Sequence, residues 1–170
     1  MYNQEHVAIA NKTSRGKGFI GRMAITPEYV REYVNTALSI HTATILDFGA
    51  GKTAEHTKAM LNDGYQVLAH EFGDNVDPKV HCELALLNEY DIVFASNVLN
   101  VQSDEEMARA TISQASECVK TDGAFIANYP SDPRKSDLTP SEMMDILCDY
   151  FKFVMKVGGT NAKPLWCCLK

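Results

Sequence analysis

Residues 47–53, with the sequence DFGAGKT, carry the clearest indication of how this chain folds. They end like a triphosphate-binding loop, but the pattern of such a loop, G-x-x-x-x-G-K-[ST], requires a glycine where Leu46 stands. Gly49 and Gly51 instead allow a tight turn whose backbone comes close to a ligand. An apolar run at residues 44–48 precedes the turn and a helix-period segment follows it. The stretch therefore predicts a strand, a turn that binds a nucleoside-containing ligand, and a helix whose N-terminal amides face that ligand.

A carboxylate follows this turn at a spacing typical of nucleoside-binding folds. Glu71 stands about twenty residues beyond the turn, at the end of a second predicted strand, where it can accept hydrogen bonds from both ribose hydroxyls. As G-x-G-x-x-A, ending at Ala54, the stretch matches a dinucleotide-binding fingerprint. Asp47 favours a different ligand, because a carboxylate beside the turn repels a pyrophosphate but attracts a ligand with an ammonium and a sulfonium group.

Short apolar runs alternate with helix-period segments along the chain, which is typical of an α/β domain with a mainly parallel sheet. The predicted strands span residues 44–48, 66–71, 79–82, 91–96, 124–129, 153–157 and 165–169. The predicted helices span residues 27–40, 53–62, 104–120 and 141–151.

Residues with strong local preferences mark the ends of these elements. The expected helix starts are Thr26 with Pro27, then Ser103 or Asp104, and finally Thr139 with Pro140. The pair Asp122-Gly123 predicts a turn before the fifth strand. The pair Gly158-Gly159 predicts the turn that joins the last two strands in an antiparallel arrangement.

Two motifs together resemble the class I S-adenosylmethionine (SAM)-dependent methyltransferases. The D-x-G-x-G pattern at residues 47–51 is similar to the first motif of that family, and YDIVFASNVLN at residues 90–100 is similar to its fourth-strand motif. The resemblance covers roughly residues 44–130, with weaker support beyond. It implies an α/β, three-layer Rossmann-like sandwich with a seven-stranded, mainly parallel sheet whose last strand is antiparallel. It also implies a single domain over residues 1–170, with an N-terminal lid segment and helix in 1–40 and a Rossmann-like core in 44–170.

The same resemblance implies SAM as the cofactor and assigns residues to its parts. Asp47, Gly49 and Gly51 would surround the methionine part, and Glu71 would hold the ribose. Glu83 and Leu84 would lie near the adenine, and Ser96 and Asn97 would lie nearest the reactive methyl group. The chain departs from the family at Thr53, where many members carry a further glycine. No metal site is expected.

Methyl transfer from a sulfonium is an in-line displacement that alignment and desolvation can accelerate, so no universal catalytic residue is predicted. If the acceptor loses a proton, the candidate bases are His70, His81 and Tyr129, each of which has a structural role as its alternative. The N(D)PP(Y/F) signature of amino-methylating DNA enzymes belongs after the fourth strand, where this chain has SNVL at residues 96–99. The similar stretch NYP at residues 128–130 follows the fifth strand instead, and no Pro-Cys dipeptide of cytosine-5 enzymes is present. The methyl acceptor is therefore not identified.

Two basic loops suggest an anionic acceptor, either a nucleic acid or a small phosphorylated molecule. The basic residues of these loops are Lys12, Arg15, Lys17 and Arg22 before the first predicted helix, and Arg134 and Lys135 after the fifth strand. In a Rossmann-like fold both loops can flank the ligand crevice. The alternative for the first loop is a flexible, solvated lid over the cofactor. The net charge of −6 argues against a generally basic nucleic-acid-binding surface.

The bulk composition limits the remaining classes of function. The 170 residues, 45% hydrophobic and 22% charged, are typical of one soluble globular domain, and no run approaches the roughly 18 apolar residues of a membrane span. Without a secretory signal pattern, a cytoplasmic location is expected. The five cysteines show no C-x-x-C or Cys/His spacing, so neither a disulfide framework nor a zinc site is indicated. A non-catalytic SAM-binding or interaction module stays as an alternative, whereas a nicotinamide oxidoreductase is disfavoured by Asp47 and by length; the oligomeric state is not predicted.

Overall fold

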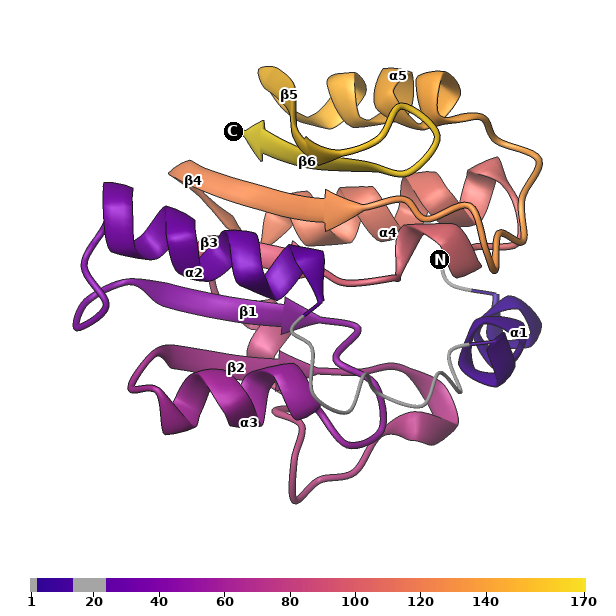
Figure 1. Ribbon diagram of the computed structural model, residues 1–170. Helices are drawn as coiled ribbons and strands as arrows, with labels where there is room; N and C mark the ends of the chain where they lie inside the picture. Colours follow the sequence, from indigo (N-terminus) through magenta and orange to yellow (C-terminus); the bar gives the residue numbers. More distant parts are fainter. Residues whose placement is uncertain (1–2, 14–23) are drawn as a thin grey trace.

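The computed structural model describes residues 3–13 and 24–170, and these residues form an α/β sandwich around one sheet (Figure 1). The strands are β1 Thr44–Phe48, β2 Gln66–His70, β3 Tyr90–Ala95, β4 Val119–Asn128, β5 Phe153–Gly159 and β6 Pro164–Leu169, in the order β2-β1-β3-β4-β6-β5. The first four strands pair in parallel, while β6 runs antiparallel to both β4 and β5. The predicted Rossmann-like α/β fold and its antiparallel last strand are therefore confirmed.

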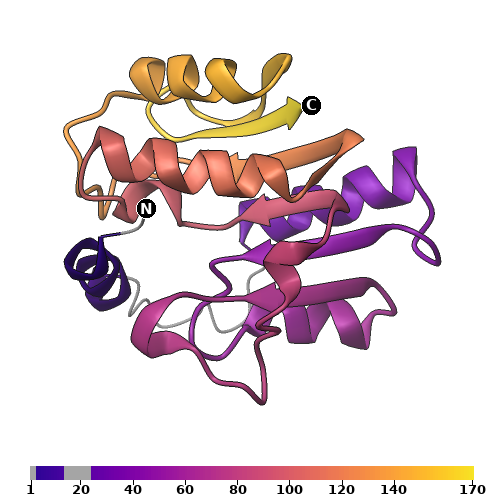
Figure 2. The same ribbon diagram turned by 180° about the vertical axis from the view of Figure 1, so that it is seen from behind.

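Helices cover both faces of the sheet (Figures 1 and 2). One face carries α2 (Ile25–Ala37) and α3 (Glu55–Asn62), and the other carries α4 (Glu105–Glu117) and α5 (Pro140–Tyr150). A further helix, α1 (Gln4–Thr13), lies at the edge of the sheet where the parallel strands end.

Alternation along the buried strands produces the two cores of the sandwich. Ile92 and Phe94 of β3 pack with the α2 and α3 side of the sheet. Val93 and Ala95, which lie between and after them, pack with the α4 and α5 side. Because successive side chains point to opposite faces, a strand that is covered on both faces is apolar throughout, as β3 is.

The predicted seven-stranded sheet is corrected to six strands in the described part of the chain, because residues 79–82 do not form one. The amides of Val80 and His81 both donate to Asp77 O, at 2.9 and 2.8 Å, and so close a turn instead of a ladder. One sheet-like hydrogen bond is left, from Cys82 N to Ala69 O of β2 at 2.9 Å. The segment thus runs beside β2 without becoming a strand.

Two predicted turns are also corrected, because Asp122-Gly123 and Gly158-Gly159 both lie inside strands. Gly123 belongs to β4, where an added Cβ would lie 2.9 Å from Asp91 O, so glycine permits the close approach of β3. Gly158 and Gly159 belong to β5. The turn between β5 and β6 falls at residues 160–163 instead.

The predicted helix starts are confirmed for two helices and wrong for one. Asp104 caps α4 by accepting from Met107 N at 2.9 Å, and Thr139 starts α5 in a reciprocal capping box with Glu142. The first predicted helix starts earlier than expected, because the N-cap of α2 is Ala24 and Thr26 lies inside the helix. Helix α1 was not predicted.

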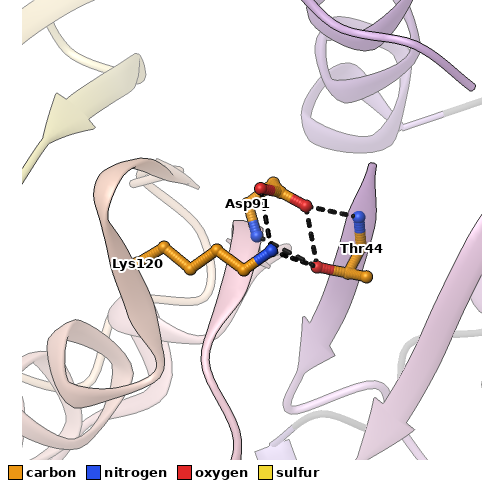
Figure 3. A network of polar contacts seen from close by, with 3 residues as sticks. All are labelled: Thr44, Asp91 and Lys120. Carbon is orange, nitrogen blue, oxygen red and sulfur yellow. Dashed lines mark hydrogen bonds and ion pairs between the residues drawn. The ribbon is translucent and has the colours of Figure 1, made fainter. Parts of the chain in front are cut away.

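A polar network ties three strands together at the amino edge of the sheet (Figure 3). One carboxylate oxygen of Asp91 accepts from the amide of Thr44 at 2.7 Å and from its hydroxyl at 2.8 Å, and the other accepts from Lys120 Nζ at 2.9 Å. Burial raises the pKa of Asp91, but the hydrogen bonds from Thr44 and Lys120 outweigh it and hold the pKa below the ordinary value. The ionised carboxylate therefore stabilises the start of the sheet.

Replacing Asp91 with alanine is expected to lower the free energy of unfolding by about 1–2 kcal/mol at pH 7. Because the pKa of Asp91 is lowered in the fold, this stability is present above the unfolded value of 3.8 and is lost as the pH falls below it. Urea unfolding across pH measures the difference. Lys120→Met, which removes only the half-exposed partner, is the control; an equal loss in both variants would contradict the central role of the carboxylate.

Among the described residues, no helix is both long and apolar enough to cross a membrane.

Candidate functional site

The predicted site residues lie at the carboxyl edge of the sheet, where the chain reverses its direction of winding. From β1 the chain passes to β2 on one side and later returns to β3 on the other side. In open α/β sheets, such a switch point leaves a crevice between the loops that follow the two strands, and ligands bind there. The loop after β1 is the glycine turn.

The glycine turn has a backbone that only glycine adopts without strain at two positions. Gly49 and Gly51 both have φ of 74°. The amides of Gly49 and Ala50 each donate to His70 O of β2 at 2.9 Å, and Ala54 N donates to Gly51 O at 3.1 Å. A Cβ on Gly49 would lie 2.7 Å from Val98 Cγ2, whereas a Cβ on Gly51 would meet nothing within 4 Å. The turn is thus packed at its first glycine and open at its second.

Glu71 lies directly against this open glycine. Its carboxylate oxygens accept from Gly51 N at 2.5 Å and from Phe72 N at 2.7 Å, and the residue is only 8% exposed. Burial raises the pKa of Glu71, although these backbone hydrogen bonds oppose the effect. The structure therefore brings together the glycine turn and the acidic residue that the sequence singled out separately.

Asp47 lies inside the protein rather than on the surface of the crevice. It is 1% exposed, and Thr57 of α3 donates its hydroxyl proton to the carboxylate at 2.8 Å. Burial, and to a lesser extent the nearby charge of Glu71, raise the pKa of Asp47 to about 7, although the hydrogen bonds from Thr57 oppose the shift. Asp47 thus exchanges a proton near neutral pH.

Replacing Asp47 with asparagine is expected to stabilise the ligand-free fold by about 2 kcal/mol at pH 8. The folded pKa of about 7 exceeds the unfolded value of 3.8, so wild-type stability falls as the pH rises through this window. The asparagine variant lacks this loss, and its advantage is expected to vanish near pH 4. Thermal unfolding across pH measures it, with Asp122→Asn at an exposed position as control. An advantage that does not change with pH would contradict the burial argument.

Ser96 and Asn97 lie at the end of β3, next to the end of β4. Asn97 has φ of 58°, and it exchanges two hydrogen bonds with Asn128 of β4: its amide donates to Asn128 Oδ1 and Asn128 Nδ2 donates to its Oδ1, both at 2.8 Å. The hydroxyl oxygen of Ser96 is covered and has no hydrogen-bond partner among residues 3–13 and 24–170. The sequence showed Asn128 only as part of the NYP stretch at residues 128–130, because its pairing with Asn97 depends on two distant strands.

Glu83 and Leu84 follow the turn that replaces the predicted strand, and both are exposed. Leu84 is 63% exposed. A role beside an adenine remains a prediction for these two residues.

The three candidate bases have defined surroundings. Tyr129 is fully buried and its hydroxyl donates to Leu138 O at 2.8 Å. His81 has hydrogen-bond partners at both ring nitrogens, the amide of Asp77 and the carbonyl of Gly51. Burial lowers the pKa of His70, whose ring packs edge-on against Phe72 at 4.6 Å between ring centroids. Each therefore has a structural role in the ligand-free protein.

The predicted basic loops are described only in part. Arg15, Lys17 and Arg22 lie outside the described residues, and Lys12 is exposed on α1. Arg134 lies 4.0 Å above the ring centre of Tyr129 and donates to two backbone carbonyls, while Lys135 is exposed. Near them, between the loops that follow β3 and β4, is a hollow of about 300 Å³ lined by Ser103, Asp104, Glu105, Ser136, Asp137, Leu138 and Glu142.

Helix α1 crosses the carboxyl edge of the sheet from the end of β2 to the loop after β3. Asn11 Nδ2 donates to Phe72 O at 3.0 Å, and Val7 packs so closely that a Cβ on Gly73 would lie 2.8 Å from it. At its other end, His6 Nδ1 lies 3.3 Å from a carboxylate oxygen of Asp104. The helix therefore joins the segment after β2 to the start of α4.

These features define the class of the fold. A Rossmann-like sheet with a glycine turn after β1, an acidic residue after β2 and an antiparallel edge hairpin is the fold of class I methyltransferases, and this chain has that fold.

Solved structures of several methyltransferases are similar to it. Magnesium protoporphyrin IX methyltransferase from Synechocystis PCC 6803 with bound SAH (S-adenosylhomocysteine) has a TM-score of 0.71 and 14% identity, over 99% of this chain and 100% of that one. The 1,6-didemethyltoxoflavin-N1-methyltransferase of Burkholderia thailandensis has a TM-score of 0.59 and 15% identity, over 85% and 76% of the two chains. A 16S rRNA methyltransferase of T. thermophilus has a TM-score of 0.58 and 16% identity, over 90% and 45%. Identities this low establish the fold alone.

No protein-family model matches the sequence, and no curated protein matches it either.

Proposed function

We propose that this protein is a SAM-dependent methyltransferase. One observation carries the proposal: at the switch point of the sheet, the carboxylate of Glu71 lies 2.5 Å from the amide of Gly51. A glycine turn and a carboxylate at this place are the groups that recognise the amino-acid part and the ribose of an amino-acid nucleoside. The similar structures include methyltransferases solved with SAM or SAH, which supports the same cofactor here.

The residues around the turn fit this cofactor. The face of Gly51 is open for 4 Å, so backbone can approach a ligand there. Glu71 accepts one hydrogen bond at each carboxylate oxygen, and a carboxylate can accept about four, which leaves sites for two ribose hydroxyls. Ser96 Oγ is covered but has no partner, so it has a hydrogen bond to offer at the end of β3. These are the groups that would hold the cofactor.

When bound, SAM supplies a methyl group on a sulfonium, which is already a good leaving group. The chain's own residues then contribute alignment and exclusion of water. Glu71 and Gly51 would hold the cofactor, and Asp47 would supply negative charge for its cationic part. Asn97 is held by its two hydrogen bonds with Asn128. It would form part of the surface that contacts the methyl acceptor. Helix α1 covers this edge and excludes water in the manner of a lid.

The acceptor we propose is an anionic molecule, either a nucleic acid or a small phosphorylated compound. Lys12 on α1 and Lys135 after β4 are the exposed, described cations that support it. The hollow between the loops after β3 and β4 has an acidic lining, which would repel an anionic acceptor. We therefore expect the acceptor to reach the site by a path outside this hollow.

A transfer assay separates this proposal from a non-catalytic SAM-binding module. Wild-type protein and a Glu71→Gln control are incubated with SAM that carries a labelled methyl group and with RNA, DNA or pools of phosphorylated metabolites. Label is expected in one acceptor class with the wild type only, and its transfer is expected to weaken as salt rises. Tight SAM binding without transfer to any pool supports the binding module instead.

A further inference from the structure

The turn that replaces the third predicted strand, at residues 79–82, holds a histidine ring against the glycine turn. His81 is 6% exposed, and its ring lies between the backbone of its own turn and Gly51. The sequence offered it as a candidate base, but neither ring nitrogen is available for an acceptor.

The hydrogen bonds of the ring determine which nitrogen carries the proton. Asp77 N lies 2.9 Å from His81 Nδ1, and an amide can only donate, so Nδ1 is the acceptor and carries no proton. The neutral ring therefore carries its proton on Nε2, which lies 2.9 Å from Gly51 O and donates to it. The turn closed by Asp77 O, which accepts from the amides of Val80 and His81, holds the ring in place.

Gly51 is thereby held on both sides. Its amide donates to Glu71, and its carbonyl accepts from His81 as well as from Ala54 N at 3.1 Å. Gly51 has φ of 74°, and among the described residues no atom lies within 4 Å of a Cβ built on it, so no described side chain packs there to fix its peptide groups. Its orientation depends on these hydrogen bonds.

We propose that His81 is a positioning residue that fixes the Gly51 backbone for cofactor binding, acting from the irregular segment that stands where the third strand was predicted. The effect on affinity rests on the proposed function. The effect on the orientation of Gly51 does not depend on the proposed function, and it can be measured without a cofactor.

The first test uses wild-type protein labelled with nitrogen-15 and no cofactor. The ring spectrum of His81 is expected to show a protonated Nε2 and an unprotonated Nδ1 at pH 8. A ring protonated at Nδ1, or an even mixture of both forms, would overturn the proposal, because the bond to Gly51 O would then be absent.

The second test uses two variants that each keep one half of the ring's function. His81→Gln keeps a donor at the position of Nε2, and His81→Asn keeps an acceptor at the position of Nδ1. By calorimetric titration, SAH is expected to bind His81→Gln within about threefold of the wild type and His81→Asn about tenfold more weakly. Both variants bury a neutral amide, so a purely structural role would lower their melting temperatures without separating their affinities.

Equal affinities in the two variants would overturn the proposal. If the wild type itself binds no SAH, the proposed function fails, and the proposal for His81 is then decided by the Gly51 amide. Its chemical shift is expected to move in His81→Asn and to stay near the wild-type value in His81→Gln. The reverse pattern counts against the proposal.

Discussion

Replacing Glu71 with glutamine is expected to weaken SAH binding about 100-fold, or about 2.8 kcal/mol. The two carboxylate oxygens now accept from two backbone amides, at 2.5 and 2.7 Å. A glutamine amide has one acceptor oxygen, so its NH₂ group must face one of these donors in a buried place. The variant therefore loses a ribose acceptor and also disturbs the turn that Glu71 supports.

Calorimetric titration with SAH measures this effect, and Glu117→Gln on the exposed end of α4 is the matched control. Thermal unfolding of each variant separates a loss of affinity from a loss of folded protein. An affinity for the Glu71 variant within a few fold of the wild type would remove Glu71 from the site.

Replacing Gly49 with alanine is expected to lower the free energy of unfolding by about 3 kcal/mol. The left-handed backbone of Gly49, with φ of 74°, disfavours any side chain, and the new Cβ would lie 2.7 Å from Val98 Cγ2. Val98 itself is 8% exposed and belongs to a packed core. Its side chain can therefore move away from the new Cβ only by displacing its neighbours.

Gly51→Ala is the matched control, because Gly51 has the same φ of 74° but open space around the added Cβ. It is expected to lose only about 1 kcal/mol of stability, from backbone strain, while its methyl group intrudes on the ligand face. Urea unfolding ranks the two variants, and calorimetry with SAH tests the second. A Gly51 variant that is less stable than the Gly49 variant would contradict the packing of the turn.

The core of the site could be predicted from sequence because it depends on local patterns. The two glycines after a strand and the carboxylate of Glu71 each occupy a strand end, and parallel strands bring their carboxyl ends to the same edge. Their direct contact at 2.5 Å follows from that topology.

Other features depend on contacts between distant segments and were missed. The sequence placed Asp47 at the mouth of the crevice, but Thr57 of the next helix holds it in the interior. Residues 79–82 have a strand-like composition, yet the turn from Asp77 uses the amides that a ladder would need. Helix α1 is stabilised mainly by its contacts with Phe72, Gly73 and Asp104, none of which its own short sequence reveals.

The most direct test of the account is a calorimetric titration of the wild-type protein with SAM, SAH and NAD. The open face of Gly51, the Glu71 carboxylate and the charge of Asp47 favour a cationic amino-acid nucleoside over a diphosphate. We expect SAM and SAH to bind at one site per chain and NAD to give no heat of binding. Binding of NAD together with no binding of SAM or SAH would contradict the account.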